Sequence, residues 1–368
     1  MQKLKIAVNT RLLLKNRIEG IGRYSYEILN SMTKSHPEIE FHFIFDRPYD
    51  SSFIFSDNVI PHLIGPQARH PFLYYIWFHK RIPSLLKKIG AHAYFSPEGY
   101  SPLKLDIPIF VTIHDLNFLH RPQDLPSLER WYYNKFFPQY AENATKVFTV
   151  SEYSRQDLIN SYNLDNSKVL LTYNGAEHLA IGTKKEVDHE YFLYVGSLHA
   201  RKNIEGLLQS FEKYKSKFSN KQKLIIVGKK MFSNDIIEHL YNRMTFKDDV
   251  IFKGYVSNDE LSNLYRNSLA LVNLSYFEGF GIPLVEAFKN DIPVIISNKS
   301  SFPEVCGKDY PKFEPEAHEE IAEEMNKIAS NESYRNELIS KGMKQLDLFS
   351  WRKSSDIIIN QIIKHVGA

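Results

Sequence analysis

The sequence is poor in the features that mark secreted, membrane-spanning and nucleic-acid-binding proteins. Its 368 residues include one cysteine, Cys306, so no intrachain disulfide bond is possible. No apolar run approaches the ~20 residues needed to cross a bilayer. The basic start "MQKLKIAVNTRLLLKNR" predicts a first strand and not a secretion signal, because polar residues interrupt its short apolar run. Lys and Arg (46) nearly balance Asp and Glu (43), whereas nucleic-acid binding favours a basic stripe. A cytoplasmic protein is the default expectation.

Several short catalytic motifs are also missing. The sequence has no D-x-D and no H-E-x-x-H, and its single cysteine excludes a thiolate cluster, so we expect no metal. It has no G-x-x-x-x-G-K-[ST] loop, which disfavours a P-loop NTPase. It has no G-x-S-x-G either, which leaves hydrolase chemistry without support.

What is present is an alternation of short apolar strands with helical patterns, which predicts an α/β fold with two doubly wound, Rossmann-like parallel sheets. The charged segment around residues 176–190 breaks this pattern and predicts the linker. We therefore expect an N-terminal domain over residues 1–178, completed by an amphipathic helix over 350–368, and a C-terminal domain over 190–349. The expected strands are 4–9, 40–45, 93–96, 108–113, 147–150, 169–173, 191–196, 223–228, 249–255, 269–274 and 293–297.

Unusual residues recur directly after these strands, where open α/β sheets bind their ligands. Gly20 and Gly22 follow the first strand in "GIGRYSYEIL", and His114 follows the strand "IFVTI". Arg201 and Lys202 follow "FLYVG" in "SLHARKN". This repetition is stronger evidence for a site than any one of these short motifs.

The stretch "SYFEGFGIPLVEAF" follows another strand and carries two glutamates around a glycine-rich turn. Pro283 is suited to the first position of a helix, which places Glu286 about one turn inside the helix and Glu278 on the loop before it. An ionised carboxylate can accept hydrogen bonds from a vicinal diol, and a helix N-terminus favours an anion. The pattern therefore suits a ligand in which hydroxyl groups flank a phosphate. An acidic residue near a helix N-terminus is also ordinary dipole chemistry.

The basic pair and the histidine each have two interpretations. Lys202 and Arg201 could hold a diphosphate, or they could form a solvated basic loop. His114 could contact a reacting sugar, or it could be structural.

Together these segments resemble glycosyltransferase family 4, the retaining enzymes of two-domain GT-B fold. "EGFGIPLVE" resembles the E-x7-E motif, "YVGSLHARKN" the loop that supplies the diphosphate-binding lysine, and "GIGRYSYEIL" the N-terminal glycine loop. The resemblance covers almost the whole chain and extends to bacterial mannosyltransferases. It implies two domains facing across a cleft, with the C-terminal helix crossing back to the first domain.

The resemblance also implies roles for individual residues. The expected catalytic residues are Glu278, which faces the transferred sugar, Lys202 on the phosphates, and His114 near the sugar. Glu286 is expected to bind the ribose hydroxyls of the donor. The other expected donor-binding residues are Arg201, Ser197, Gly279, Phe280, Gly281, Ile282, Tyr255, Val256, Gly20 and Gly22. Many members have Arg directly after the glycine of this strand, where this chain has Ser197, so Arg201 would supply the missing charge.

The implied reaction moves a sugar from a nucleoside diphosphate to a hydroxyl group of a glycan or lipid-linked acceptor, with retained configuration and without a cofactor or metal. GDP-mannose is the first expected donor and UDP-linked sugars come next. Three alternatives remain open from the residues: a nucleotide-sugar epimerase, a sugar phosphorylase of the same fold, and a non-enzymatic two-domain sugar-binding protein. The aromatic and basic segment from Arg69 to Gly90 is either a peripheral contact with the inner face of the membrane or a helix with a solvated basic end.

Overall fold

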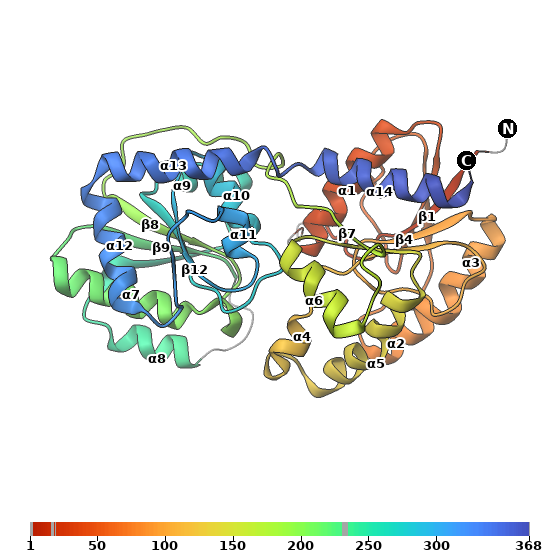
Figure 1. The fold of residues 1–368 in the computed structure, drawn as a ribbon, viewed down its shortest axis with the longest axis horizontal. Helices are drawn as coiled ribbons and strands as arrows, with labels where there is room; N and C mark the ends of the chain where they lie inside the picture. The colour runs from red at the N-terminus through yellow and green to blue at the C-terminus, as the bar shows by residue number, and fades with distance from the viewer. Residues whose placement is uncertain (1–2, 16–17, 19, 230–234, 368) are drawn as a thin grey trace. The chain divides into compact units, whose positions relative to one another are not determined.

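The computed structural model describes residues 3–15, 18, 20–229 and 235–367, which form two compact units. The first unit comprises Met1–Asn174 together with Trp351–Ala368, and the second comprises Gly175–Ser350 (Figure 1). Each unit contains one sheet, and every strand pair in both sheets is parallel. The fold is therefore α/β and doubly wound, with two Rossmann-like units.

The sheet of the first unit has seven strands in the order β3-β2-β1-β4-β5-β6-β7. These strands are apolar and mostly buried because helices cover both faces of the sheet. They are β1 (Lys5–Asn9), β2 (Glu40–Phe45), β3 (Val59–Leu63), β4 (Ala93–Ser96), β5 (Ile109–Thr112), β6 (Lys146–Thr149) and β7 (Val169–Leu171). The helices are α1 (Ile21–Ser35), α2 (Pro71–Ile76), α3 (Ile82–Ile89), α4 (Asn117–His120), α5 (Ser127–Asn143), α6 (Glu152–Tyr162) and α14 (Trp351–Val366).

The sheet of the second unit has six strands in the order β10-β9-β8-β11-β12-β13. They are β8 (Tyr191–Val195), β9 (Lys223–Val227), β10 (Val250–Gly254), β11 (Ala270–Asn273), β12 (Val294–Ser297) and β13 (Lys312–Phe313). The helices are α7 (Ile204–Phe218), α8 (Asp235–Arg243), α9 (Asn258–Asn267), α10 (Ile282–Lys289), α11 (Phe302–Cys306), α12 (His318–Ser330) and α13 (Glu332–Leu346). The strand order reverses between β8 and β11, which puts the loops after these two strands side by side at a topological switch point.

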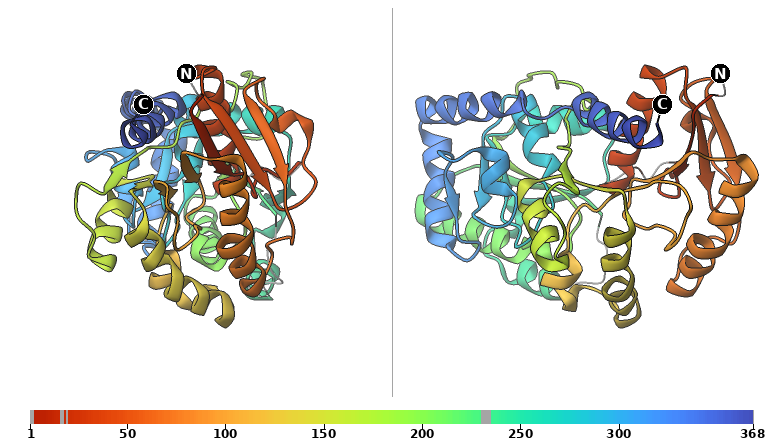
Figure 2. Two further views of the ribbon diagram at one scale, coloured as in Figure 1. Left: turned by 90° about the vertical axis from the view of Figure 1, so that its right-hand side faces the viewer. Right: turned by 45° about the vertical axis from the view of Figure 1, so that its right-hand side comes forward.

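The C-terminal helix α14 returns to the unit that contains the N-terminus, as Figures 1 and 2 show in blue beside red. Its Ile358, Ile359 and Ile362 are buried, and Trp351 packs against Tyr24 of α1 with ring centroids 6.0 Å apart. The amphipathic pattern of the tail therefore predicted this helix.

Two strands escaped the sequence pattern, and both lie at sheet edges. β3 contains Pro61, whose missing N–H is tolerated on an edge strand, and Pro61 and His62 interrupt its apolar run. β13 has two residues, which is too short for any periodicity. Between α2 and α3 the chain makes a π-helical turn over Trp77–Arg81, and Pro83 lies in the first turn of the helix that follows.

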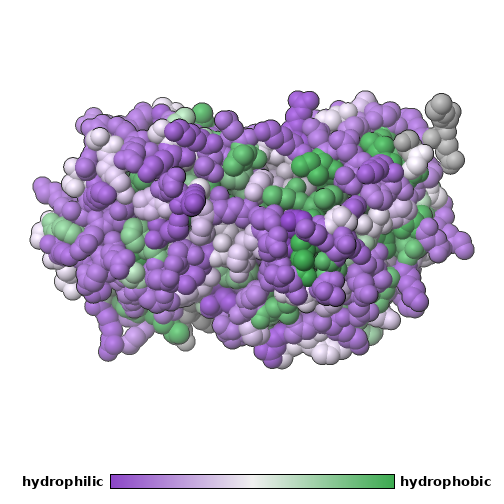
Figure 3. Space-filling view, viewed as in Figure 1, coloured by the Kyte–Doolittle hydropathy of each residue, from purple (hydrophilic) through white to green (hydrophobic). Residues whose placement is uncertain are grey.

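None of the helices in the described ranges has the length and apolarity required to cross a membrane. Hydrophilic residues cover most of the face shown in Figure 3, and the apolar residues on that face form small groups.

Candidate functional site

The loop after β8 places two cations at the carboxyl edge of the second sheet. Arg201 and Lys202 lie in a single 3-10 turn over Ala200–Lys202, and Asn203 ends this turn with a φ of 53°. Asn203 also begins α7, because its side chain accepts a hydrogen bond from the backbone N–H of Gly206 at 3.0 Å. The carbonyl of Arg201 accepts a hydrogen bond from the N–H of Tyr276 at 2.8 Å, so the loops after β8 and β11 are tied together.

Glu278, on the loop after β11, binds both cations with one carboxylate. Lys202 donates to Oε1, and Arg201 Nη1 donates to Oε2 at 2.9 Å. Ser275 Oγ adds a third hydrogen bond to Oε1 at 2.9 Å. Burial by itself would raise the pKa of Glu278, but Lys202 and Arg201 stabilise the ionised form and lower the pKa to about 2. This carboxylate is therefore ionised at neutral pH.

Arg201 lies beside Lys202, on the other oxygen of the Glu278 carboxylate. Its guanidinium also donates to the carbonyl of Phe277 at 2.8 Å, which fixes its position beside Lys202. Ser197 provides only a backbone carbonyl to the hydroxyl of Tyr194, at 3.1 Å. The two cations of "SLHARKN" therefore converge on one point, in contrast to a solvated basic loop.

The turn before α10 explains the glycines of "EGFGIPL". Gly281 has a φ of 105°, and a Cβ there would lie 2.7 Å from the ring of Phe302, so only glycine fits without strain. Ser301 Oγ donates to the carbonyls of Glu278 and Phe280 at 3.0 and 2.9 Å, which holds the turn. The ring of Phe280 is buried against Phe349.

Helix α10 begins at Ile282 with proline in its first turn, as the sequence predicts. Its first turn contains no acidic residue, so its N–H groups remain a suitable end for an anion. Glu286 lies one turn further along and is buried. Its Oε2 accepts a hydrogen bond from the hydroxyl of Tyr265 at 2.7 Å, and its Oε1 accepts one from His178 Nε2 at 2.8 Å. The two glutamates therefore have separate partners: Lys202 and Arg201 for Glu278, and Tyr265 and His178 for Glu286.

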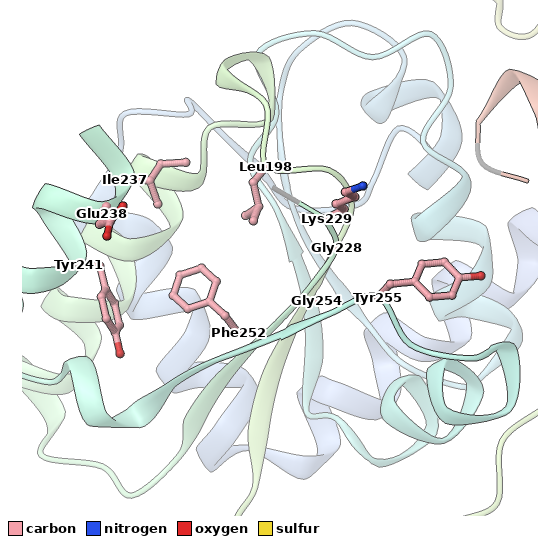
Figure 4. A pocket seen from close by; sticks show the side chains of 9 residues that line it. All are labelled: Leu198, Gly228, Lys229, Ile237, Glu238, Tyr241, Phe252, Gly254 and Tyr255. Atoms are coloured by element: carbon pink, nitrogen blue, oxygen red, sulfur yellow. The ribbon is translucent and has the colours of Figure 1, made fainter. Parts of the chain in front are cut away.

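A pocket of about 440 Å³ adjoins the loops after β8, β9 and β10 (Figure 4). Its size lies within the ~300–1,000 Å³ typical of small-molecule sites. Figure 4 shows Ile237, Tyr241 and Phe252 gathered on one side of the strands, whereas Tyr255 points away from them. Tyr255 is 68% exposed, and Val256 beside it is half-buried. The lining residues are Leu198, Gly228, Lys229, Ile237, Glu238, Tyr241, Phe252, Gly254 and Tyr255.

The remaining predicted residues lie in the first unit. His114 follows β5, and its Nε2 donates to the carbonyl of Pro97 at 2.8 Å, which leaves Nδ1 as an acceptor. Burial lowers the pKa of His114, so the neutral ring is favoured. Its ring also packs edge-on against Tyr24, with centroids 4.6 Å apart. Gly20 precedes α1 with a φ of 49°, and Gly22 is buried in the first turn.

Within the described ranges, no cluster of three or more His, Cys, Asp or Glu side chains could hold a metal ion.

Two family models match consecutive parts of the chain. "Glycosyltransferase Family 4" matches residues 18–178, and "Glycosyl transferases group 1" matches residues 176–345. The chain is a glycosyltransferase that consists of a family 4 domain followed by a group 1 domain. The group 1 match contains Lys202, Glu278 and Glu286, and the family 4 match contains His114.

Curated relatives of this glycosyltransferase include bacterial enzymes of similar length. O-antigen chain mannosyltransferase B of Escherichia coli is 28% identical over 372 residues, which covers 94% of this chain and 96% of that protein. O-antigen chain mannosyltransferase RfbU of Salmonella typhimurium is 29% identical over 67% of this chain and 68% of that protein. These matches support a nucleotide-sugar glycosyltransferase and give no support to an epimerase, a phosphorylase or a non-enzymatic binding protein.

The solved structures confirm the GT-B fold. Sucrose-phosphate synthase of Thermosynechococcus elongatus superposes with a TM-score of 0.79 at 17% identity, over 98% of both chains.

Sequence reasoning missed the side chains that hold the glutamates. Tyr265 lies on α9, His178 lies in the segment before β8, and Ser275 precedes Glu278 by three residues. Ser275 begins the stretch after β11 and His178 ends the segment "YNGAEH" after β7, but neither residue was assigned a role, and Tyr265 lies on a helix. The one available signal is chemical, since a buried carboxylate requires nearby hydrogen-bond donors.

Proposed function

We propose that this glycosyltransferase transfers mannose from GDP-mannose to a glycan or lipid-linked acceptor of a bacterial surface polysaccharide, with retention of the anomeric configuration. The observation that carries the proposal is the convergence of Lys202 and Arg201 on Glu278 at the switch point of the second sheet. The names of the two curated relatives support mannose as the sugar. Retention is supported by the E-x7-E motif.

In the proposed reaction, the bond between the anomeric carbon and the diphosphate oxygen breaks, and a bond to the acceptor oxygen forms on the same face. The acceptor proton passes to the departing phosphate, so no protein base is required. Negative charge grows on the diphosphate as it leaves, and fixed positive groups lower the barrier. Lys202 provides a compact charge, Arg201 a planar fork, and the N–H groups at the start of α10 a partial positive charge.

Glu278 and Glu286 are proposed to hold the donor at two points. Glu286 would accept hydrogen bonds from the ribose hydroxyls, and Glu278 would contact the transferred sugar. Glu278 also opposes the charge of the two cations, so an incoming diphosphate would share or replace these ion pairs. We propose that Nδ1 of His114 accepts a hydrogen bond from a hydroxyl group of the sugar.

The apolar pocket beside Leu198 supports a site for the nucleobase. Leu198 lies four residues before Lys202, so the pocket and the two cations belong to the same loop. The aromatic rings of Tyr241 and Phe252 provide surfaces on which a base could stack. Tyr255 and Val256 follow Gly254 at the mouth of this pocket.

The direct test is a thermal-shift panel of GDP, UDP, GDP-mannose and UDP-glucose, run with EDTA. At a hundredfold excess over its dissociation constant, a bound donor should stabilise the second unit by roughly 2.7 kcal/mol. Lys202→Ala and Glu286→Ala should each abolish or greatly weaken the shift, whereas Lys213→Ala, on the exposed side of α7, should keep it. Wild-type shifts in both site variants would exclude this donor site, and a larger shift with UDP than with GDP would reassign the base.

We also propose that the first unit contacts an anionic membrane through α2 and α5. Phe72 is 66% exposed, Tyr75 42% and Trp131 52%. Tyr75 and Trp131 both pack against Phe136, with ring centroids 6.1 and 6.2 Å away, so they form one continuous patch. Lys135 lies over the Trp131 ring at 4.9 Å.

The charge around this aromatic patch supports an anionic partner. The segment from Asn58 to Pro97 contains no acidic residue. Its basic residues, all exposed, are Arg69, Lys80, Arg81, Lys87 and Lys88. Exposed aromatic rings beside basic side chains are typical of proteins that rest on anionic lipid surfaces. Such a contact would bring a lipid-linked acceptor to the enzyme.

A further inference from the structure

One face of α10 binds the chain segment that enters the second unit. Lys289 Nζ donates to the carbonyl of Ala176 at 3.0 Å, and Asn290 Oδ1 accepts from the N–H of Gly182 at 2.8 Å. Glu286, Lys289 and Asn290 are three and four positions apart, so they lie on the same face of the helix. The segment from 176 to 182 is therefore anchored to α10 at both ends.

His178 lies between these two anchors and reaches the donor-side glutamate. Its side chain is buried, and Nε2 lies 2.8 Å from Glu286 Oε1. An ionised carboxylate can only accept hydrogen bonds, so the proton of this bond is on Nε2. The anchors determine how far along α10 the ring lies.

Tyr265 binds the other oxygen of the Glu286 carboxylate. Its hydroxyl donates to Glu286 Oε2 at 2.7 Å, and its ring is fully buried. Burial and the neighbouring Glu286 raise the pKa of Tyr265 well above its usual range, so the phenol keeps its proton. The carboxylate plane is thus held from both oxygens by side chains of two different elements.

The packing around this arrangement leaves little room for adjustment. A Cβ on Gly182 would lie 2.1 Å from the carbonyl oxygen of Ser262 on α9, so the segment touches both α9 and α10 at close range. Each carboxylate oxygen has about two acceptor positions, so one position on each oxygen remains for a further hydrogen bond. Two such positions in one fixed plane match a vicinal diol.

We propose that His178 and Tyr265 are positioning residues that orient Glu286 for the two ribose hydroxyls of the donor. The inference rests on the proposed role of Glu286 and assigns to two further residues the geometry of that contact. Both act through Glu286. Loss of either hydrogen bond would let the carboxylate rotate, which weakens recognition of the diol more than recognition of the base or the phosphates.

The test compares GDP with 2′,3′-dideoxy-GDP, which lacks both ribose hydroxyls, by titration calorimetry on the full chain. The parent should prefer GDP by about tenfold or more, since hydrogen bonds to a charged group are worth this much. His178→Ala and Tyr265→Phe should each lower this preference by roughly fivefold through weaker binding of GDP, with binding of dideoxy-GDP unchanged. His178→Gln, whose amide can still donate, should keep most of the preference.

Two further variants separate the possible failures. Lys213→Ala, on the exposed side of α7, alters neither this segment nor Glu286, and it should leave the preference intact. Glu286→Gln should lose it. The inference is overturned if His178→Ala and Tyr265→Phe keep the full preference, or weaken both ligands equally, while Glu286→Gln loses it. If Glu286→Gln also keeps the preference, the proposed role of Glu286 itself is wrong.

Discussion

Glu278 is a buried residue whose charge depends on two neighbours. Lys202 and Arg201 bind its two oxygens, and Ser275 adds a hydrogen bond. A buried carboxylate with only polar neutral neighbours would resist ionisation. The pKa of Glu278 is therefore low because the two cations lie so close to its carboxylate.

This pairing predicts a loss of stability in acid. Because the pKa of Glu278 is lowered to about 2 in the folded state, its contribution is fully present above its unfolded pKa and is lost as the pH falls through the folded value. Between about pH 5 and pH 3 the second unit of the parent should lose roughly 2 kcal/mol more than that of Glu278→Gln. Hydrogen exchange of α10 is the suitable measurement, because Trp77, Trp131 and Trp351 all lie in the first unit. Parallel curves for parent and variant would show that this ion cluster is not present in solution.

His114 gives a second prediction at this scale. Burial lowers its pKa, and Nε2 donates to Pro97, so the ring should remain neutral, with the proton on Nε2, at pH values where an exposed histidine is already charged. Nitrogen-15 NMR of histidine-labelled protein measures both the tautomer and the pKa. A titration of His114 near 6.5, or a proton on Nδ1, would contradict the proposed acceptor role of that atom.

The sequence predicted these residues individually, and their contacts came only from the structure. Lys202, Glu278 and His114 follow strands, and the carboxyl edge of a parallel sheet collects such residues. The sequence could not show that Arg201 would reach the same carboxylate as Lys202, because this depends on a single 3-10 turn and on a bond between two loops. The contact of His178 with Glu286 could not be predicted for a related reason, because the position of His178 depends on the hydrogen bonds that hold its segment to α10.

At the scale of elements, the turn before α10 determines where the helix begins. Gly281 combines a φ of 105° with a Cβ position 2.7 Å from Phe302. Both features act on the first turn of the helix, whose N–H groups are proposed to face the phosphates.

Gly281→Ala should therefore destabilise the protein by about 2–4 kcal/mol, from backbone strain and overpacking together, and should weaken binding of GDP. Gly254→Ala is the matched control, because Gly254 has a φ of 68° but open space around its Cβ position. It should cost only about 1–2 kcal/mol, from the backbone alone. Urea unfolding followed by circular dichroism measures both. Equal losses in the two variants would show that Phe302 moves aside.

Strands and helices could be predicted where their buried faces produce a regular pattern of apolar residues in the sequence. Several of the eleven expected strands are continuously apolar, and all eleven are present. The two missed strands lie at sheet edges, where one side of the strand has no partner and the apolar pattern fades. The segment 176–185 looked like a linker, yet its backbone is paired with the side chains of Asn263, Asn267 and Asn290. Hydrogen bonds between backbone and asparagine side chains produce no periodic pattern, so they could not be predicted from the sequence.

At the scale of the whole molecule, the chain completes its first unit only with its last helix. It leaves that unit after Asn174 and returns at Trp351. The amphipathic tail indicated a helix, and family resemblance indicated where the helix packs. The exposed rings of Phe72 and Tyr75 on α2 and of Trp131 on α5 are far apart in the sequence, so no single stretch of sequence shows them together.

The membrane contact proposed for this patch is tested with the full chain and lipid vesicles. Binding should require about 30% phosphatidylglycerol in phosphatidylcholine and should weaken in high salt, because each basic side chain near an anionic surface contributes about 1 kcal/mol. The double variant Phe72→Ser/Trp131→Ser should bind roughly tenfold more weakly, since two exposed rings no longer enter the interface. Leu348→Ser, which changes an exposed apolar residue of the second unit, should bind like the parent. Sedimentation of vesicles measures all three proteins. Equal binding of the parent and the double variant, or no binding to either kind of vesicle, would leave the aromatic patch without a role at the membrane.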